Sequence, residues 1–252
     1  MIKKTHLAAA LAALALSGQA WSATFVNGGF EDGNLNGWTG GGGTWFGSPA
    51  APVDPANYIG GTPNNTIMTG GNDPITGAAR VYGGSHSVRV NDSNNNYSVS
   101  TLTQSVANYT DNSIFFAWNA VLEASHGLAD SDYFSLTLVD NTTQTTLVNR
   151  AYSSAGAIGG GAQGVTWTQY GSWYSSGWVV EQIDLAALGA VGHDFTLTLL
   201  ASDCPYGGHA GYVYLDGFGA VNPPTGGTVP VPGGLALLCI GMLGLGLARR
   251  KH

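Results

Sequence analysis

One short segment of the chain concentrates aromatic and polar side chains. Residues 167–174 read Trp-Thr-Gln-Tyr-Gly-Ser-Trp-Tyr. Aromatic rings can stack on the apolar faces of sugars, and Gln, Ser and Thr side chains can hydrogen-bond to sugar hydroxyl groups. The segment therefore predicts a carbohydrate-binding surface made by Trp167, Tyr170, Trp173 and Tyr174. The competing interpretation is that these rings fill the core of a β-sandwich.

A second candidate site is the carboxylate pair Asp130 and Asp132, which precedes a predicted strand beginning at Tyr133. Ca²⁺ prefers about six to eight oxygen ligands, and an Asp-x-Asp loop can supply some of them. The same spacing is also common in loops rich in Asn and Asp that simply face water. The pair therefore predicts either a calcium site or a solvated loop.

The histidines and cysteines do not form a recognisable metal motif. His126, His193 and His209 lack the short spacing and the accompanying Cys pair of a sequence-encoded zinc site, so we expect ordinary loop histidines. Cys204 is interpreted as a small buried residue near a strand end, with a reactive or intermolecular thiol as the alternative. Cys239 falls in an apolar tail, so no intramolecular disulfide is expected in the processed protein.

Motifs of enzymes are missing from the sequence. It contains no Gly-x-Ser-x-Gly elbow, no His-Glu-x-x-His and no P-loop. A glycosidase would need two placed carboxylates, and the chain between its two ends offers only three glutamates besides its aspartates. We therefore predict no catalytic residues and no enzymatic activity.

Charge divides the chain into three unlike pieces. Five of its eight Lys and Arg residues lie at the extreme ends, and the region between them holds three arginines against all fifteen acidic residues, a formal charge of −12. This balance argues against nucleic acid as a partner. The cationic ends are typical of membrane-targeting signals and are not expected to be part of the folded domain.

The N-terminal piece has the pattern of a secretory signal peptide. Lys3 and Lys4 precede an apolar run at 7–16, and small residues follow up to Ala23. We therefore expect residues 1–23 to be a signal-peptide helix that is removed on export.

The C-terminal piece is an apolar run with a basic end. Residues 233–248 are uncharged and apolar, and Arg249, Arg250 and Lys251 follow at once. Cations stay on the cytoplasmic side, so this pattern predicts a transmembrane helix with the body of the protein outside and a basic cytoplasmic tail at 249–252. A plain single-pass anchor is the alternative interpretation.

A short proline motif before this run points to a more specific tail. The sequence passes through a Gly/Pro linker at 222–232 that ends in Val229-Pro230-Val231-Pro232, followed by Gly233. Together with the apolar helix and the basic end, this arrangement resembles the PEP-CTERM sorting signal. The resemblance implies an exosortase-type enzyme as partner, passage through the inner membrane and C-terminal processing. Val231 stands where the motif usually has Glu, and Gly233-Gly234 also resembles the tail processed by rhombosortases, so either sorting enzyme is compatible with the tail.

The body of the chain, residues 24–221, is patterned for β-strands. Apolar and polar residues alternate at 133–139 and 195–199, and further strands are expected at 87–90, 97–106, 113–122, 147–152, 178–183 and 211–220. Only 185–188 has a helical period. Short strands with Gly-rich turns predict an all-β fold, a single β-sandwich of the jelly-roll type. The Gly- and Pro-rich stretch 40–77 is expected to be a surface loop or flap rather than a core strand.

Two terminal patterns sharpen this expectation. Phe25-Val-Asn-Gly-Gly-Phe-Glu31 near the start and Gly211-Tyr-Val-Tyr-Leu-Asp-Gly-Phe218 near the end resemble the galactose-binding-like jelly rolls that include many carbohydrate-binding modules. The resemblance implies a structural Ca²⁺ that joins the first and last strands, with Glu31 and Asp216 as carboxylate ligands. The alternative is that both side chains only accept local hydrogen bonds.

Taken together, these patterns predict an exported, C-terminally sorted protein of the cell surface or extracellular matrix. The second hypothesis is a calcium-stabilised carbohydrate-binding module that recognises a secreted polysaccharide. Under both hypotheses the protein contacts the inner membrane only transiently.

Overall fold

Alternating apolar and polar residues form strands where the sequence predicts them. In the computed structural model, which describes residues 24–46, 54–127, 131–157 and 164–219, all eight predicted strands are present, with ends shifted by at most three residues. They are β3 (His86–Val90), β4 (Ser98–Val106), β5 (Ser113–Glu123), β6 (Tyr133–Asp140), β7 (Thr145–Ser153), β10 (Val179–Asp184), β11 (Phe195–Ser202) and β12 (Gly211–Gly219).

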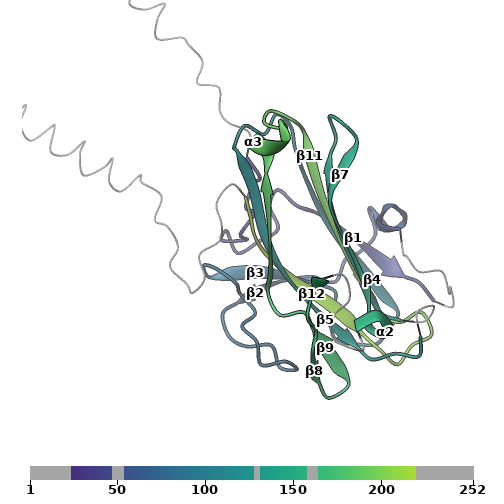
Figure 1. Cartoon of the computed structure of the whole chain (residues 1–252). Coiled ribbons are helices and arrows are strands. Elements are labelled where there is room, and N and C mark those ends of the chain that lie inside the picture. Colours follow the sequence, from purple (N-terminus) through teal and green to yellow (C-terminus); the bar gives the residue numbers. More distant parts are fainter. Residues whose placement is uncertain (1–23, 47–53, 128–130, 158–163, 220–252) are drawn as a thin grey trace, which may run out of the picture.

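These strands pair into two antiparallel sheets that face each other (Figure 1). One sheet has the order β1-β4-β11-β6-β7, with β1 (Thr39–Thr44) at its edge. The larger sheet has the order β2-β3-β12-β5-β9-β8, and β10 also pairs with β5. Its additional strands are β2 (Asn65–Thr69), β8 (Thr168–Tyr170) and β9 (Trp173–Ser175). The eight main strands thus lie as β3-β12-β5-β10 over β4-β11-β6-β7, which is the strand order of a jelly roll.

The core fills the space between the two sheets. Every second residue of β5 and β6 points inward, so Phe116 and Trp118 meet Phe134 and Leu136, all with no exposed surface. The rings of Trp118 and Phe134 lie 5.0 Å apart between centroids. Burial of large apolar side chains, at about 25 cal/mol per Å², stabilises the sandwich across this space.

The stretch 40–77 corrects the prediction of a loop without strands. Its first glycines form β1, which pairs with β4, and residues 65–69 form β2, which pairs with β3. Glycine is required in β1 because the segment 58–63 crosses it closely: a Cβ on Gly41 would lie 2.3 Å from the Tyr58 carbonyl oxygen, and one on Gly42 would lie 2.4 Å from that of Thr62. The glycine run therefore allows a close backbone approach rather than flexibility.

Helices are few and short among the described residues. They are the 3₁₀ turn η2 (Pro55–Tyr58), α2 (Ser154–Ala157) and the predicted helix α3 (Leu185–Leu188). None of these helices approaches the length and apolar character needed to cross a membrane. The predicted signal peptide (1–23), linker (222–232), transmembrane helix (233–248) and basic tail (249–252) lie outside the described residues, as does the whole sorting motif.

Candidate functional site

The hairpin of β8 and β9 places two of the four predicted aromatic residues on one surface. Tyr170 lies directly opposite Trp173, which in turn lies opposite Glu123 of β5. Residues opposite each other in antiparallel strands project from the same face, so the three side chains form one row on the outer face of the larger sheet. Tyr170 is 36% exposed, and the half-buried Trp173 ring rests against Tyr212, with 5.9 Å between centroids. The sequence did not predict Glu123 as a site residue, although side chains of β5 alternate between the faces and Glu123 falls on the outer one.

The other two aromatic residues correct the sequence prediction. Tyr174 follows Trp173 in the strand and therefore points to the opposite, inner face, where it is part of the core. Trp167 is 5% exposed, and its ring meets that of Tyr152 edge to face, 5.4 Å away. Neither ring offers a free face to a ligand.

A loop formed by residues 70–84 covers the middle of the same outer face. Asp73 accepts hydrogen bonds from the hydroxyl groups of Tyr212 and Tyr214, at 2.7 and 2.8 Å, and both rings are buried. The indole N–H of Trp178 donates to the Ala79 carbonyl oxygen at 2.9 Å. The loop therefore leaves the hairpin aromatics at the sheet edge open while it seals the central tyrosines.

Glu31 and Asp216 both face the turn formed by residues 82–86. Asp216 Oδ2 accepts from the backbone N–H groups of Tyr82 and Gly83, at 2.8 and 3.0 Å. The Glu31 carboxylate accepts from those of Ser85 and His86, at 2.9 to 3.1 Å. The two carboxylates thus clamp one turn between the first segment and the last strand.

The negative charges of Glu31 and Asp216 repel each other, and a bound cation would reduce this repulsion. Burial raises the pKa of Asp216 to about 7, and the nearby Glu31 charge adds to the rise against the backbone hydrogen bonds that oppose it. A carboxylate can accept at about four lone-pair positions, so oxygen lone pairs remain beside the four N–H groups. The pair therefore fits as two of the roughly six to eight oxygens of a calcium shell.

Only Asp132 of the second predicted calcium pair belongs to the described residues, and it does not face solvent. Asp130 lies outside the described residues, and Asp132 is completely buried. Its Oδ2 accepts from the backbone N–H of Glu123 at 2.9 Å. Burial raises the pKa of Asp132 well above its ordinary value, and the charges of Asp203 and Glu123 act in the same direction. Asp132, directly before β6, is therefore an interior residue that accepts a backbone hydrogen bond.

A groove of about 290 Å³ lies on the opposite side of the sandwich, over the smaller sheet. Four threonine hydroxyls line it together with η2 and its flanks, and none of its lining residues is aromatic. The lining consists of Asp54, Pro55, Ala56, Ile59, Thr101, Thr103, Thr137 and Thr198. The groove offers hydrogen bonds to a ligand but no ring for stacking, which distinguishes it from the hairpin surface.

Known proteins resemble this chain only in structure. No protein-family model and no curated protein sequence matches it. Similar solved structures include TmCBM61 in complex with β-1,4-galactotriose (12% identity, 77% of this chain and 95% of that chain, TM-score 0.38). They also include CBM27-1 of Caldicellulosiruptor saccharolyticus in complex with mannohexaose (10% identity, 81% of this chain and 97% of that chain, TM-score 0.39). A third is CBM28, a module specific for non-crystalline cellulose (12% identity, 81% of this chain and 95% of that chain, TM-score 0.37). At these identities and TM-scores, the similarities assign no ligand to this chain.

Proposed function

We propose that this sandwich is a non-catalytic carbohydrate-binding domain and that Tyr170 and Trp173 form its stacking platform. The observation that supports the proposal is their direct pairing on an open edge hairpin, with Trp173 braced by Tyr212. A braced ring loses little conformational freedom when a sugar stacks on it. Glu123 lies next in the row, and its Oε1 faces the hydroxyl of Ser172 at 3.5 Å. These groups supply the hydrogen bonds that would orient a sugar beside the rings.

Affinity electrophoresis of the purified protein against a panel of soluble polysaccharides tests this proposal. An aromatic contact contributes about 0.5–1.5 kcal/mol, so Tyr170→Ala and Trp173→Ala should each weaken binding roughly two- to tenfold. Tyr206→Ala is the matched control, because Tyr206 is 52% exposed on a different loop. A double variant at 170 and 173 that binds as tightly as the original protein contradicts the platform, and retention by no polysaccharide contradicts the function.

Structural calcium is a second part of the proposal, with Glu31 and Asp216 as its ligands. The support is the convergence of both carboxylates on the turn 82–86 and the charge repulsion between them. The ion would join the first segment to β12 and so stabilise the sandwich rather than contact a sugar.

Delivery to the cell surface is a separate proposal that rests on the sequence alone. The signal peptide, the Pro230-Val231-Pro232 motif and the basic end at Arg249 and Arg250 support export through the inner membrane and cleavage by an exosortase-type enzyme. Intact-mass measurement of the secreted protein should show loss of the residues after the motif. A protein that stays in the inner membrane with Arg249 to His252 still attached contradicts processing.

A further inference from the structure

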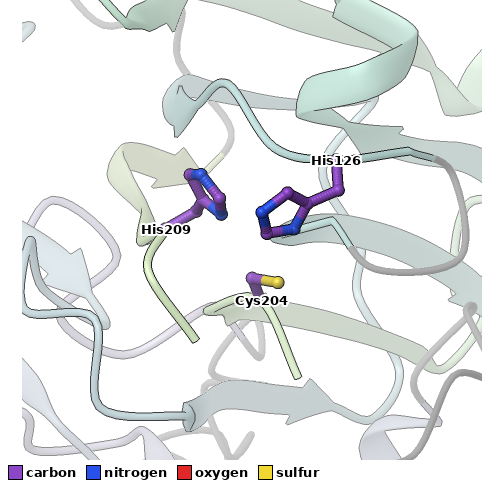
Figure 2. A group of neighbouring side chains, drawn as sticks. All are labelled: His126, Cys204 and His209. Carbon is purple, nitrogen blue, oxygen red and sulfur yellow. The ribbon is translucent and has the colours of Figure 1, made fainter. Parts of the chain in front are cut away.

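Three metal-ligating side chains from two distant parts of the chain meet at one end of the sandwich. Cys204 and His209 lie on the loop between β11 and β12, and His126 lies just after β5. The candidate ligand atoms of the three residues lie within 4.8 Å of one another. Figure 2 shows the two imidazole rings and the thiol converging on one space. The sequence predicted ordinary loop histidines, and the fold brings His126 and His209 together beside Cys204.

Backbone hydrogen bonds hold this arrangement in place. The N–H of Cys204 donates to the His209 carbonyl oxygen at 3.0 Å, which fixes the two ends of the loop against each other. Gly207 and Gly208, with φ of 82° and 88°, make the turn between them. The N–H of Glu123 donates to the Ala210 carbonyl oxygen at 3.0 Å, and Glu123 Oε2 accepts from the Ala210 N–H at 3.1 Å. The loop is thereby fastened to the end of β5.

The position of His126 is fixed in a similar way. Its neighbour Ser125 donates a hydrogen bond to Ser131 Oγ at 2.7 Å and also lies 2.7 Å from Ser154 Oγ. The rings of His126 and His209 then meet edge to face, with 4.6 Å between centroids. Both ligand-bearing segments are therefore held by hydrogen bonds of their own.

The two imidazole nitrogens and the sulfur of this cluster indicate which type of ion it would bind. We propose that His126, Cys204 and His209 form a three-ligand site for a borderline-soft transition-metal ion, specifically Zn²⁺. A thiolate with two imidazoles suits such an ion, whereas Ca²⁺ and Mg²⁺ require oxygen ligands. Zinc bonds of about 2.0–2.3 Å place tetrahedral ligands roughly 3.3–3.8 Å apart, so side-chain shifts of about 1 Å close the site. Cys204 is buried, His209 is half-buried and His126 is exposed, so an ion can enter from the side of His126.

Three ligands leave one coordination position of a tetrahedral ion to solvent. The described residues that form the group contribute no fourth His, Cys, Asp or Glu. With these three ligands alone, the fourth position would be filled by water, in contrast to a closed zinc site of four protein ligands. Its pH dependence follows from the need to deprotonate Cys204 for binding.

Cobalt substitution tests the site directly. The full protein, purified without a histidine tag and kept reduced, should bind one equivalent of Co²⁺ with a thiolate-to-cobalt charge-transfer band, and Zn²⁺ should abolish that band. Even the loss of a group that only supports a ligand weakens metal binding about 10–100-fold, so Cys204→Ser should raise the Kd more than tenfold and remove the band. His126→Gln should weaken binding similarly, and His86→Gln, which removes an imidazole outside the cluster, should leave it unchanged.

The exposed His126 keeps the test decisive if the buried Cys204→Ser variant does not fold. Circular dichroism of both variants identifies that case, and His126→Gln then carries the comparison with His86→Gln. Three results overturn the proposal: no stoichiometric binding of either ion, equal affinities of the original protein and His126→Gln, or binding of copper without binding of zinc.

Discussion

Asp73 Oδ2 accepts a hydrogen bond of 2.7 Å from the hydroxyl group of Tyr212, although 139 positions separate the two residues in the sequence. Tyr214 donates to the same oxygen at 2.8 Å. These two bonds attach the loop 70–84 to the middle of the larger sheet, and the guanidinium of Arg89 lies 5.8 Å from the centre of the Tyr212 ring. Strand β12 is therefore covered on both faces at its centre.

Removal of either hydroxyl should loosen this attachment. A hydrogen bond to a charged group contributes about 1.5–3 kcal/mol, so Tyr212→Phe and Tyr214→Phe should each lower the free energy of unfolding by that amount. Because the bonds share one oxygen, we expect the double variant to lose less than the sum of the two. Urea unfolding measures these values, with Tyr206→Phe as an exposed control. Equal stability of all variants would show that the loop is held by other contacts.

Acid should release the same loop. Burial alone would raise the pKa of Asp73, but hydrogen bonds from Tyr212, Thr76 and Tyr214 outweigh it and lower the pKa below its ordinary value. The stability that Asp73 supplies is therefore present above its unfolded-state pKa of about 3.9 and is lost as the pH falls through the lower folded-state value. Melting temperatures between about pH 2.5 and pH 7 should fall less on acidification in Asp73→Asn than in the original protein. Parallel curves contradict this assignment.

Two neighbouring glycines of β1 should respond differently to the same substitution. In Gly42→Ala the new Cβ would lie 2.4 Å from the Thr62 carbonyl oxygen and 2.9 Å from that of Val99, so backbone must move. Overpacking of this kind costs about 1–3 kcal/mol. In Gly43→Ala the nearest atom is a ring carbon of Tyr58 at 3.4 Å, an ordinary contact, and stability should be unchanged or slightly higher. Thermal unfolding of both variants decides whether close approach explains the glycine run.

Calcium removal should lower the melting temperature if Glu31 and Asp216 hold the ion proposed for them. We expect a chelator to reduce the melting temperature and excess Ca²⁺ to restore it, because an ion that binds only the folded state stabilises that state. In Glu31→Gln the response should be weaker. A melting temperature that is the same with chelator and with Ca²⁺ would leave the pair with its hydrogen-bonding role alone.

The jelly-roll strands could be predicted because each carries its own local signal. Phe195, Leu197 and Leu199 alternate with threonines, and the alternation alone places them on an inner face. Strands β1, β8 and β9 gave no such signal, since β1 is mainly glycine and the hairpin strands have three residues each. β1 pairs with β4 and β9 pairs with β5, both far away in the sequence, and β8 joins the sheet only through β9.

The candidate sites also depend on contacts between distant parts of the sequence, which local patterns do not predict. Composition identified the aromatic segment, but only the register of the hairpin separates Trp173, which faces outward, from Tyr174, which faces the core. Cys204 and His209 share one loop, but their spacing alone did not indicate a metal site. His126, 78 positions before Cys204, gave no signal, because its place depends on the pairing of β5 with β12.

The packing of Phe25 on Phe218, with 3.7 Å between ring centroids, brings the first and last described segments to the same end of the sandwich. Strand β12 runs from there to Gly211, a distance of roughly 25–30 Å, and His209 lies just beyond its far end. Both ends of the described domain therefore lie at one pole of the sandwich. The opposite pole, with Cys204 and its two histidines, lies about the length of one strand away from both ends.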